Sequence, residues 1–347
     1  MTAGASVRAD GIDDSDHEPA RHEPLIDRFG RRFTYLRVSV TERCHLRCGY
    51  CAAAGERGTD AGALLPAQFD RLLAVFRGLG ARHVRFTGGE PLLAAHLNGR
   101  ITHARALGFA RVSLTTNGHL LARRAAGLAA AGLHDVNVSL DSLDPTRFTR
   151  ITGGGDLRRV LAGLDAARRV LARVKLNVVL LRDQNLCEWP ALVAFAITHG
   201  YDIRFIEAMP LGKAGAATVA RSHVDTTAVH GELARRYRLR ELTPVPDHGP
   251  ARRFAVADST IEIGFISPLS QEFCASCNRL RLTSHGRLVY CLGHAQGLDL
   301  RPALAQGLDD EPLAALIRRQ VARDKPKGHE FGSGMGAVPV RMMAIGG

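Results

Sequence analysis

Apolar runs typical of β-strands alternate with amphipathic stretches through the first two thirds of the chain. The amphipathic stretches predict helices over 66–80, 120–131, 157–171 and 188–199. Repetition of a strand and a helix indicates a parallel sheet covered by helices. The six predicted strands cover 33–40, 83–88, 111–118, 136–141, 175–181 and 202–209.

Polar and glycine-rich clusters follow most of these strands, at the point where each strand ends. The strand–helix units could form either an open doubly wound sheet or an incomplete barrel. Because strand ends in barrel enzymes converge on one site, the clusters favour an α/β fold with an incomplete, six-unit TIM-like barrel. They are the Cys44 loop, Gly88-Gly89-Glu90-Pro91, Thr115-Thr116-Asn117-Gly118, Ser139-Leu140-Asp141 and Glu207-Ala208-Met209-Pro210.

The regular alternation stops after about Gly212. We therefore expect a partial barrel over 25–212 and a smaller α+β domain over 213–347. The second part is predicted to hold a helix over 226–236, short strands over 253–256 and 261–266, a hairpin of 278–283 with 287–291, and a final helix over 312–323.

The first 24 residues form an acidic tail that is predicted to be disordered. They carry six carboxylates and two arginines, a net charge of −4, in a chain whose net charge is +12. The remaining residues, 25–347, therefore carry +16 (12 + 4). Such a charge suits nucleic acid or a phosphate-rich small molecule, and composition does not choose between them.

No apolar run reaches the roughly 18 residues that a membrane span needs, and no signal peptide is predicted, so the expected location is cytoplasmic. In that reducing compartment cysteines more often indicate metal or redox chemistry than disulfides. Six of the seven cysteines lie in two tight groups. Cys187 stands alone in a helix-like stretch and is expected to be a small buried hydrophobe.

The first cysteine group is Cys44, Cys48 and Cys51, on one loop directly after the first strand. Three thiolates can hold three irons of a 4Fe-4S cube and leave the fourth iron open for a small molecule. A zinc site that also uses His45 is the alternative, although structural zinc ligands usually come as two separated pairs. The spacing favours iron–sulfur.

The second group is Cys274, Cys277 and Cys291, with His294 close behind. On spacing alone, a structural zinc site of three cysteines and His294 is at least as good an interpretation as a second cube. Arg279 and Arg281 lie on one face of the strand between these cysteines, where two guanidiniums would suit phosphate.

The C-x3-C-x2-C spacing of the first group, with Tyr50 before the third cysteine, resembles the radical S-adenosylmethionine (SAM) superfamily. The resemblance implies a 4Fe-4S cluster at Cys44, Cys48 and Cys51 that binds SAM and cleaves it to a 5'-deoxyadenosyl radical. It also implies four SAM contacts, which are Tyr50, Gly89 in the GGEP turn, Ser139 and Met209.

The segment FCASCNRLRLTSHGRLVYCLG resembles the GTP 3',8-cyclase (MoaA) family of molybdenum cofactor biosynthesis. The likeness runs from about Pro24 to the terminal Gly346-Gly347 and includes LRVSVTERC, RFTGGEPLL and RFIEAMPLG. It implies conversion of GTP to (8S)-3',8-cyclo-7,8-dihydroguanosine 5'-triphosphate, a second 4Fe-4S cluster at Cys274, Cys277 and Cys291, and catalytic assistance from Gly346 and Gly347.

The same resemblance carries over a set of GTP contacts. Lys175 also stands out by itself, because only four of the 46 basic residues are lysines and this one opens an apolar strand. Arg204 is a weaker candidate of the same kind. The contacts that the resemblance implies are Arg37, Arg85, Thr115, Lys175, Arg279, Leu280 and Arg281.

The expected partners are GTP, an electron donor, a second copy of the chain in a homodimer and the next enzyme of cofactor synthesis, with neither nucleic acid nor membrane. The alternatives are a radical SAM peptide maturase with an auxiliary cluster and a basic, zinc-containing RNA-binding module. Departures from the usual family pattern concern SAM-loop packing and phosphate affinity. They are Ala52, Ala53, His83 in place of lysine, Glu42 in place of aspartate, and His45 in place of asparagine.

Overall fold

The structure is a computed structural model that describes residues 23–53, 55–245, 249–331 and 338–346. Most of the predicted disordered tail, 1–22, and Gly347 lie outside the described residues. The predicted alternation of strands and helices is confirmed. The strands are β1 (Tyr35–Ser39), β2 (His83–Thr87), β3 (Arg111–Thr116), β4 (Asp135–Ser139), β5 (Arg173–Leu180) and β6 (Asp202–Glu207). The helices after them are α1 (Pro66–Gly78), α2 (Leu97–Ala106), α3 (Leu121–Ala130), α4 (Pro145–Thr152), α5 (Leu157–Val170) and α6 (Trp189–His199).

The C-terminal part contains the predicted helix over 226–236 and the predicted hairpin, and it contains three further helices that were not predicted. The helix expected to be the last is followed by another, so that prediction was wrong. The elements are α7 (Gly212–Ser222), α8 (Thr226–Arg236), β7 (Leu239–Glu241), β8 (Arg252–Val256), β9 (Glu262–Ile266), β10 (Arg279–Leu282), β11 (Arg287–Val289), β12 (Gly297–Asp299), α9 (Arg301–Ala305), α10 (Asp310–Asp324) and α11 (Met342–Ile345).

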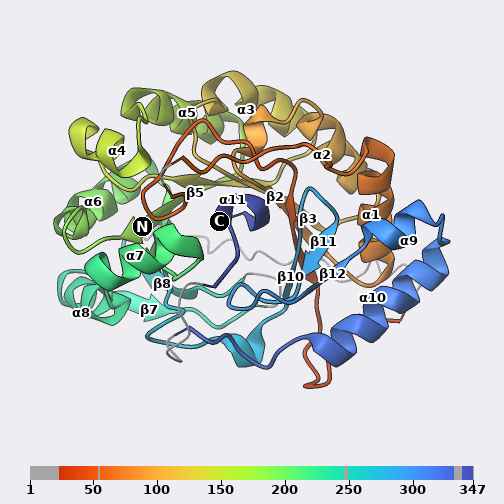
Figure 1. The fold of residues 1–347 in the computed structure, drawn as a ribbon. Helices are drawn as coiled ribbons and strands as arrows, with labels where there is room; N and C mark the ends of the chain where they lie inside the picture. Colours follow the sequence, from red (N-terminus) through yellow and green to blue (C-terminus); the bar gives the residue numbers. More distant parts are fainter. Residues whose placement is uncertain (1–22, 54, 246–248, 332–337, 347) are drawn as a thin grey trace, which may run out of the picture.

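All twelve of these strands belong to one sheet, in the order β12-β11-β10-β1-β2-β3-β4-β5-β6-β9-β8-β7. β1 to β6 are parallel neighbours, and the ladder does not close between β1 and β6. Instead β10 adds in parallel beside β1, and β9 adds in parallel beside β6. The sheet curves inside an arc of helices and forms the incomplete barrel (Figure 1). A domain boundary near Gly212 stays a prediction.

The two faces of this curved sheet differ in polarity. Successive strand residues point to opposite faces. On one face Val38, Phe86 and Leu114 are fully buried in the main hydrophobic core. On the other face Arg37 lies beside Arg85 in the β1–β2 register. The apolar core therefore fills the space between the sheet and the helices that cover it, and polar side chains occupy the inner face of the barrel.

Local signals set the helix ends. α5 begins after Asp156, whose carboxylate accepts the backbone N–H of Arg158 at 2.9 Å. α6 ends at Gly200, whose φ of +70° is favoured by glycine. Within the described ranges, no helix combines the length and the apolarity that a membrane crossing requires.

Cys187 is exposed, so the prediction of a small buried hydrophobe was wrong. It lies in a short 3-10 helix, Leu186–Glu188, just before the buried face of α6 begins at Trp189. Its Sγ accepts a contact from Arg147 Nη1 at 3.6 Å. The helix-like stretch around Cys187 is therefore this 3-10 turn, which leaves the thiol on the surface.

Candidate functional site

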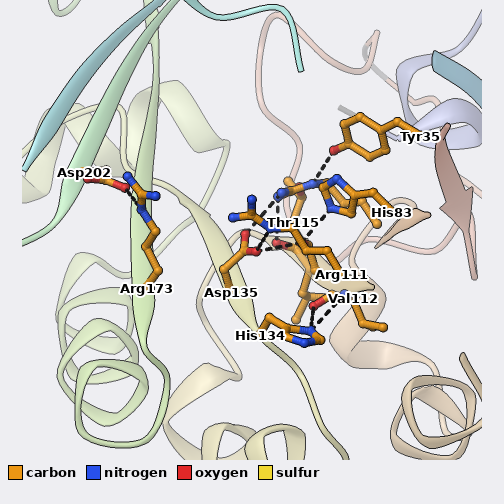
Figure 2. A network of polar contacts seen from close by, with 12 residues as sticks. Tyr35, His83, Arg111, Val112, Thr115, His134, Asp135, Arg173 and Asp202 are labelled. Carbon is orange, nitrogen blue, oxygen red and sulfur yellow. Dashed lines mark hydrogen bonds and ion pairs between the residues drawn. The ribbon is translucent and has the colours of Figure 1, made fainter. Parts of the chain in front are cut away.

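A polar floor closes the inner face of the barrel near the strand starts (Figure 2). At its centre the Asp135 carboxylate pairs with Arg85 Nη2 at 3.2 Å and Arg111 Nε at 2.7 Å. Burial raises the pKa of Asp135, but Lys175, Arg111 and Arg85 together hold it well below its usual range. The floor consists of Tyr35, His83, Arg85, Arg111, Asp135 and Lys175.

His83 belongs to this floor. Its ring stacks on Tyr35 with a centroid distance of 4.0 Å, and its Nε2 lies 2.8 Å from Ser113 Oγ. The Tyr35 hydroxyl in turn accepts Arg85 Nε at 2.6 Å. The residue that replaces the family's usual lysine therefore supports the floor, and it lines neither of the two cavities described below.

Lys175 is buried, with 3% of its surface exposed. It lies between Asn137 on β4 and Asp202 on β6 in the strand register. Burial lowers the pKa of its ammonium well below the ordinary value, and the nearby Asp135 acts in the opposite direction. The confined setting expected from the sequence is confirmed, whereas contact with GTP stays a prediction.

The first cavity lies above the floor, at the carboxyl ends of β1 to β6. Cys44, Cys48 and Cys51 all line it. Burial raises the pKa of each of these thiols, that of Cys51 to about 12. The four predicted SAM contacts, Tyr50, Gly89, Ser139 and Met209, line the same cavity.

The GGEP turn joins the ends of β2 and β3 to the loop that carries the first thiols. The buried carboxylate of Glu90 accepts Thr116 Oγ1 at 2.6 Å and the Asn117 N–H at 2.7 Å. Burial raises its pKa to about 7. A Cβ atom at Gly89 would lie 2.4 Å from the Arg43 carbonyl oxygen, so the cysteine loop itself requires glycine there.

The charged side chains that line the first cavity are carboxylates. Among the described residues, no lysine or arginine lines it. Asp141 accepts the Tyr50 hydroxyl at 2.7 Å and the Val179 N–H at 2.8 Å. Burial raises the pKa of Asp141 to about 6, although both hydrogen bonds favour its ionised form. Glu207 is the second carboxylate, and its oxygens bind backbone N–H groups of Leu269 and Ser270.

The second cavity adjoins the first on the inner face of the sheet. Cys274, Cys277 and Cys291 all line it. Within the described part of the chain no aspartate or glutamate lines it. Its cationic lining consists of Arg37 on β1, Arg204 on β6, and Arg279 and Arg281 on β10.

These guanidiniums are crowded together away from water. Burial and repulsion from neighbouring arginines lower the pKa values of Arg37 and Arg204 to about 10 each. Arg37 lies directly beside Arg281 in the β1–β10 register. Burial opposes ionisation of the Cys277 thiol, but Arg279 and Lys325 attract its thiolate strongly enough to bring its pKa down to about 7.

Asn177, Ile206 and Met209 line both cavities, which therefore meet at these residues. Sequence analysis missed two amides in this region. Asn137 and Asn177 each bury an Oδ1 atom that has no hydrogen-bond partner among the described residues. Their position on the inward-facing half of the alternating β4 and β5 patterns was the available signal.

Several predicted GTP contacts do not line the second cavity. Arg85 is part of the floor, and Thr115 lines the first cavity, where its Oγ1 lies 3.4 Å from Arg85 Nη1. The Leu280 side chain is buried in the hydrophobic core, on the face opposite Arg279 and Arg281. Roles for Arg85, Thr115 and Leu280 in GTP binding stay predictions.

The C-terminal segment lies inside the arc of strands, with α11 near its centre (Figure 1). Arg281 Nη1 donates to the Gly346 carbonyl at 2.7 Å. A Cβ atom at Gly346 would lie 2.2 Å from Thr87 Cγ2, and the residue has a φ of +70°. Gly346 thus lies against Thr87, which lines the first cavity, and Arg281, which lines the second, while Gly347 lies outside the described residues.

The donor sets fit two iron–sulfur cubes. Each group offers three thiols around one cavity. In the described ranges, no three His, Cys, Asp or Glu side chains lie close enough together to bind a single metal ion. A 4Fe-4S cube does not need such a convergence, because each thiolate binds a different iron. His45 packs against His119 with a ring distance of 5.1 Å, and His294 Nε2 binds the Gly328 carbonyl at 2.8 Å. Neither histidine lines a cavity, so the structure offers no support for the zinc alternatives.

Comparison with known proteins identifies the class of protein to which the chain belongs. The family model for the Radical SAM superfamily matches residues 38–196, and that for Molybdenum Cofactor Synthesis C matches residues 201–331. The solved structure of Streptococcus suis SuiB bound to S-adenosylmethionine has a similar fold, with a TM-score of 0.60, 19% identity, and coverage of 82% of this chain and 68% of that chain. The fold is that of radical SAM enzymes.

The curated relatives narrow this class to one family. GTP 3',8-cyclases of Brucella abortus (strain S19) and Brucella suis biovar 1 (strain 1330) are each 43% identical to the chain over 314 residues, which are 89% of the chain and 90% of the relative. The chain belongs to the GTP 3',8-cyclase family. This membership decides against the RNA-binding zinc module.

Proposed function

We propose that the chain is a radical SAM GTP 3',8-cyclase that converts GTP to (8S)-3',8-cyclo-7,8-dihydroguanosine 5'-triphosphate, the first step of molybdenum cofactor biosynthesis. It carries two 4Fe-4S clusters and uses SAM. The observation that supports this best is the division of charge between the two adjoining cavities. One is lined by carboxylates and the other by four guanidiniums.

The first cavity has the chemistry for SAM. SAM carries a sulfonium and, when its amino and carboxylate groups bind iron, presents a net positive centre. The buried Asp141 and Glu207 complement such a cation, and no basic side chain of the described lining opposes it. Cys44, Cys48 and Cys51 would hold the first cluster here, with Tyr50, Gly89, Ser139 and Met209 around the SAM.

The second cavity has the chemistry for a nucleoside triphosphate. Guanidiniums bind phosphate oxygens bidentately, and burial strengthens each interaction. Arg204, Arg279 and Arg281 have no ion pair with a carboxylate among the described residues, so their charge is available to a ligand. Cys274, Cys277 and Cys291 would hold the second cluster, against which the purine of GTP binds. The orphaned amide oxygens of Asn137 and Asn177 can accept hydrogen bonds from the nucleoside.

The chain's own task is to position GTP. When bound in the first cavity, a cluster held by Cys44, Cys48 and Cys51 together with SAM would supply a 5'-deoxyadenosyl radical, which would take the hydrogen atom from C3' of the ribose. The C3' radical of GTP then bonds to C8 of guanine, and one electron and one proton complete the product. Met209 and Asn177, at the junction of the cavities, lie where the ribose must meet the radical. The family resemblance further suggests that Gly346 and Gly347 assist the reaction.

The test is anaerobic reconstitution followed by incubation with SAM, a reductant and GTP. We expect about eight irons per chain, and 5'-deoxyadenosine formed together with a cyclised guanosine triphosphate. Zinc in the second site, or SAM cleavage that is indifferent to GTP, would overturn the proposal. A peptide maturase would instead show SAM cleavage that depends on a peptide; the likeness to SuiB concerns the fold alone.

The proposal includes the surroundings of the reaction. An electron donor must supply the reducing equivalents, and the cyclised product passes to the next enzyme of cofactor synthesis. We place the enzyme in the cytoplasm and propose that it forms a homodimer. Size-exclusion chromatography with light scattering tests the last point, and a monomeric mass would contradict it.

A further inference from the structure

Lys325 is a buried ammonium that neither the fold nor the reaction described above uses. It directly follows α10 and has 1% of its surface exposed, which makes it one of the largest fully buried side chains. Lysine is rare in this chain, with four residues among 46 basic ones. Burial disfavours the charged form of an ammonium unless polar or anionic groups compensate for the lost hydration.

The contacts of Lys325 point toward the second cysteine group. Its Nζ donates to the Tyr290 carbonyl at 2.6 Å, and Tyr290 is the residue directly before Cys291. The same Nζ lies 5.0 Å from the centre of the Phe33 ring. Among the described residues, Lys325 has no ion pair with a carboxylate. Asp27 is the carboxylate that favours its charged form, but Asp27 is itself paired with Arg31 at 2.6 Å.

The anions that favour the charged form of Lys325 are thiolates. Burial lowers the pKa of Lys325, and the largest opposing attractions come from Cys277 and Cys291. Lys325 is thus buried beside the segment that carries Cys291, and Cys277 and Cys291 are the groups that favour its charge most.

Arg31 fixes the position of this ammonium. Its Nη1 donates to the Cys274 carbonyl at 2.8 Å and to the Lys327 carbonyl at 2.7 Å, while Nη2 donates to the Pro326 carbonyl at 2.6 Å. The backbone directly after Lys325 is thus tied to the cysteine loop by the Arg31 side chain.

We propose that Lys325 is the fixed counter-charge of the second iron–sulfur cluster and raises its reduction potential. The inference rests on the proposed function, which supplies the cluster. A cube with three thiolates is negatively charged in both oxidation states, and reduction adds one further negative charge. A buried positive charge beside the ligands stabilises the reduced state more than the oxidised one, and it disfavours release of the ligands.

The test is an EPR-monitored redox titration of the reconstituted full-length enzyme without GTP. Lys325→Met removes the buried charge and keeps the length of the side chain. Lys327→Met is the matched control, because it makes the same charge change two residues away on an exposed side chain. Lys325→Arg retains the charge.

We expect the second-cluster signal of Lys325→Met to shift to a more negative potential, with the first-cluster signal unchanged. Lys327→Met should titrate like the unmodified enzyme, and Lys325→Arg should lie closer to it than Lys325→Met does. Equal second-cluster potentials for Lys325→Met and Lys327→Met would overturn the inference. An equal shift of both clusters in Lys325→Met would also overturn it.

If a variant loses the second cluster before its potential is measured, the iron count decides. Loss in Lys325→Met with retention in Lys325→Arg supports a charge role. Loss in both variants indicates a packing role and overturns the inference. Because no GTP is present, a shifted potential in an enzyme that fails to cyclise GTP would leave the inference intact and overturn only the proposed function.

Discussion

The two cysteine sites of this molecule have the same number of thiols and opposite electrostatic surroundings. In the first, burial raises the pKa of every thiol, and the charged lining is Asp141 and Glu207. In the second, Arg279 and Lys325 outweigh burial and bring the pKa of Cys277 to about 7. The thiols alone would make the two sites alike, so the surrounding charges must decide which ligand each site accepts.

The difference arises from the strand pattern. All the inward residues of β1 to β6 share one face, but the carboxyl ends of the strands carry small polar groups and carboxylates, whereas β1, β6 and β10 carry arginines at their inner positions. A single curved sheet thus holds a cation site and an anion site side by side. The variants below either remove this difference or measure its size.

Removal of a thiol should have the largest effect and should separate the two sites. Cys48→Ala is expected to lose 5'-deoxyadenosine formation entirely, because SAM then has no cluster to bind. Cys277→Ala should still cleave SAM slowly while forming no cyclised product. Iron analysis should give about four irons per chain in each variant. Cyclisation by Cys277→Ala would refute the assignment of the second site.

Removal of one guanidinium should weaken GTP binding selectively. Arg204→Ala is expected to raise the KM for GTP about ten- to a hundredfold, since a charge-assisted hydrogen bond contributes about 1.5–3 kcal/mol. SAM affinity should not change. Arg238, an exposed arginine paired with Asp258 at 2.8 Å, provides the control, and Arg238→Ala should leave both constants unaltered. Equal effects of the two variants would mean that only total charge matters.

A methyl group at Gly346 should disturb the junction of the cavities. Gly346→Ala places a carbon against Thr87 and a side chain at positive φ, a strain of about 1–2 kcal/mol that corresponds to roughly a tenfold fall in kcat. The double variant with Thr87→Gly should recover part of this loss, because the clash is removed. Absence of any loss in Gly346→Ala would show that the C-terminal segment moves aside during turnover.

The smallest expected effect is a pH dependence of SAM binding. Burial raises the pKa of Asp141 to about 6, so this carboxylate loses its charge as the pH falls through 6. SAM affinity should weaken a few fold over that range, and Asp141→Asn should abolish the dependence. Calorimetric titration of SAM at several pH values measures this dependence, and an unchanged SAM affinity from pH 7 to pH 5 would contradict it.

The same carboxylate affects the stability of the fold in the opposite direction. Because the pKa of Asp141 is raised on folding, its protonated form stabilises the folded state at a pH below its unfolded pKa, and this contribution disappears as the pH rises through 6.

The sequence was sufficient for the six parallel strands of the barrel, for four of the six helices α1 to α6 and for both thiol groups; α2 and α4 were not predicted. Apolar alternation and the spacing of Cys44, Cys48 and Cys51 depend on local chemistry, which a single chain displays. The four predicted SAM contacts line one cavity for a related reason, since each lies at or beyond the carboxyl end of a parallel strand.

Features that depend on distant segments could not be predicted. Lys325 lies between Phe33 and Tyr290, which are remote in sequence, so nothing local marks it as buried. The partnership of His83 with Tyr35 also requires knowledge of the strand register. The ion pair of Arg85 with Asp135 likewise joins two distant strands, and the role of Arg85 in GTP binding stays a prediction.

Transfer of the C3' hydrogen tests most directly whether the two cavities act on two different ligands that meet at their junction. GTP deuterated at C3' should be incubated with the reconstituted enzyme, SAM and a reductant, and the 5'-deoxyadenosine analysed by mass spectrometry. We predict 5'-deoxyadenosine that contains one deuterium atom, formed together with the cyclised product. Unlabelled 5'-deoxyadenosine alongside that product would contradict the account.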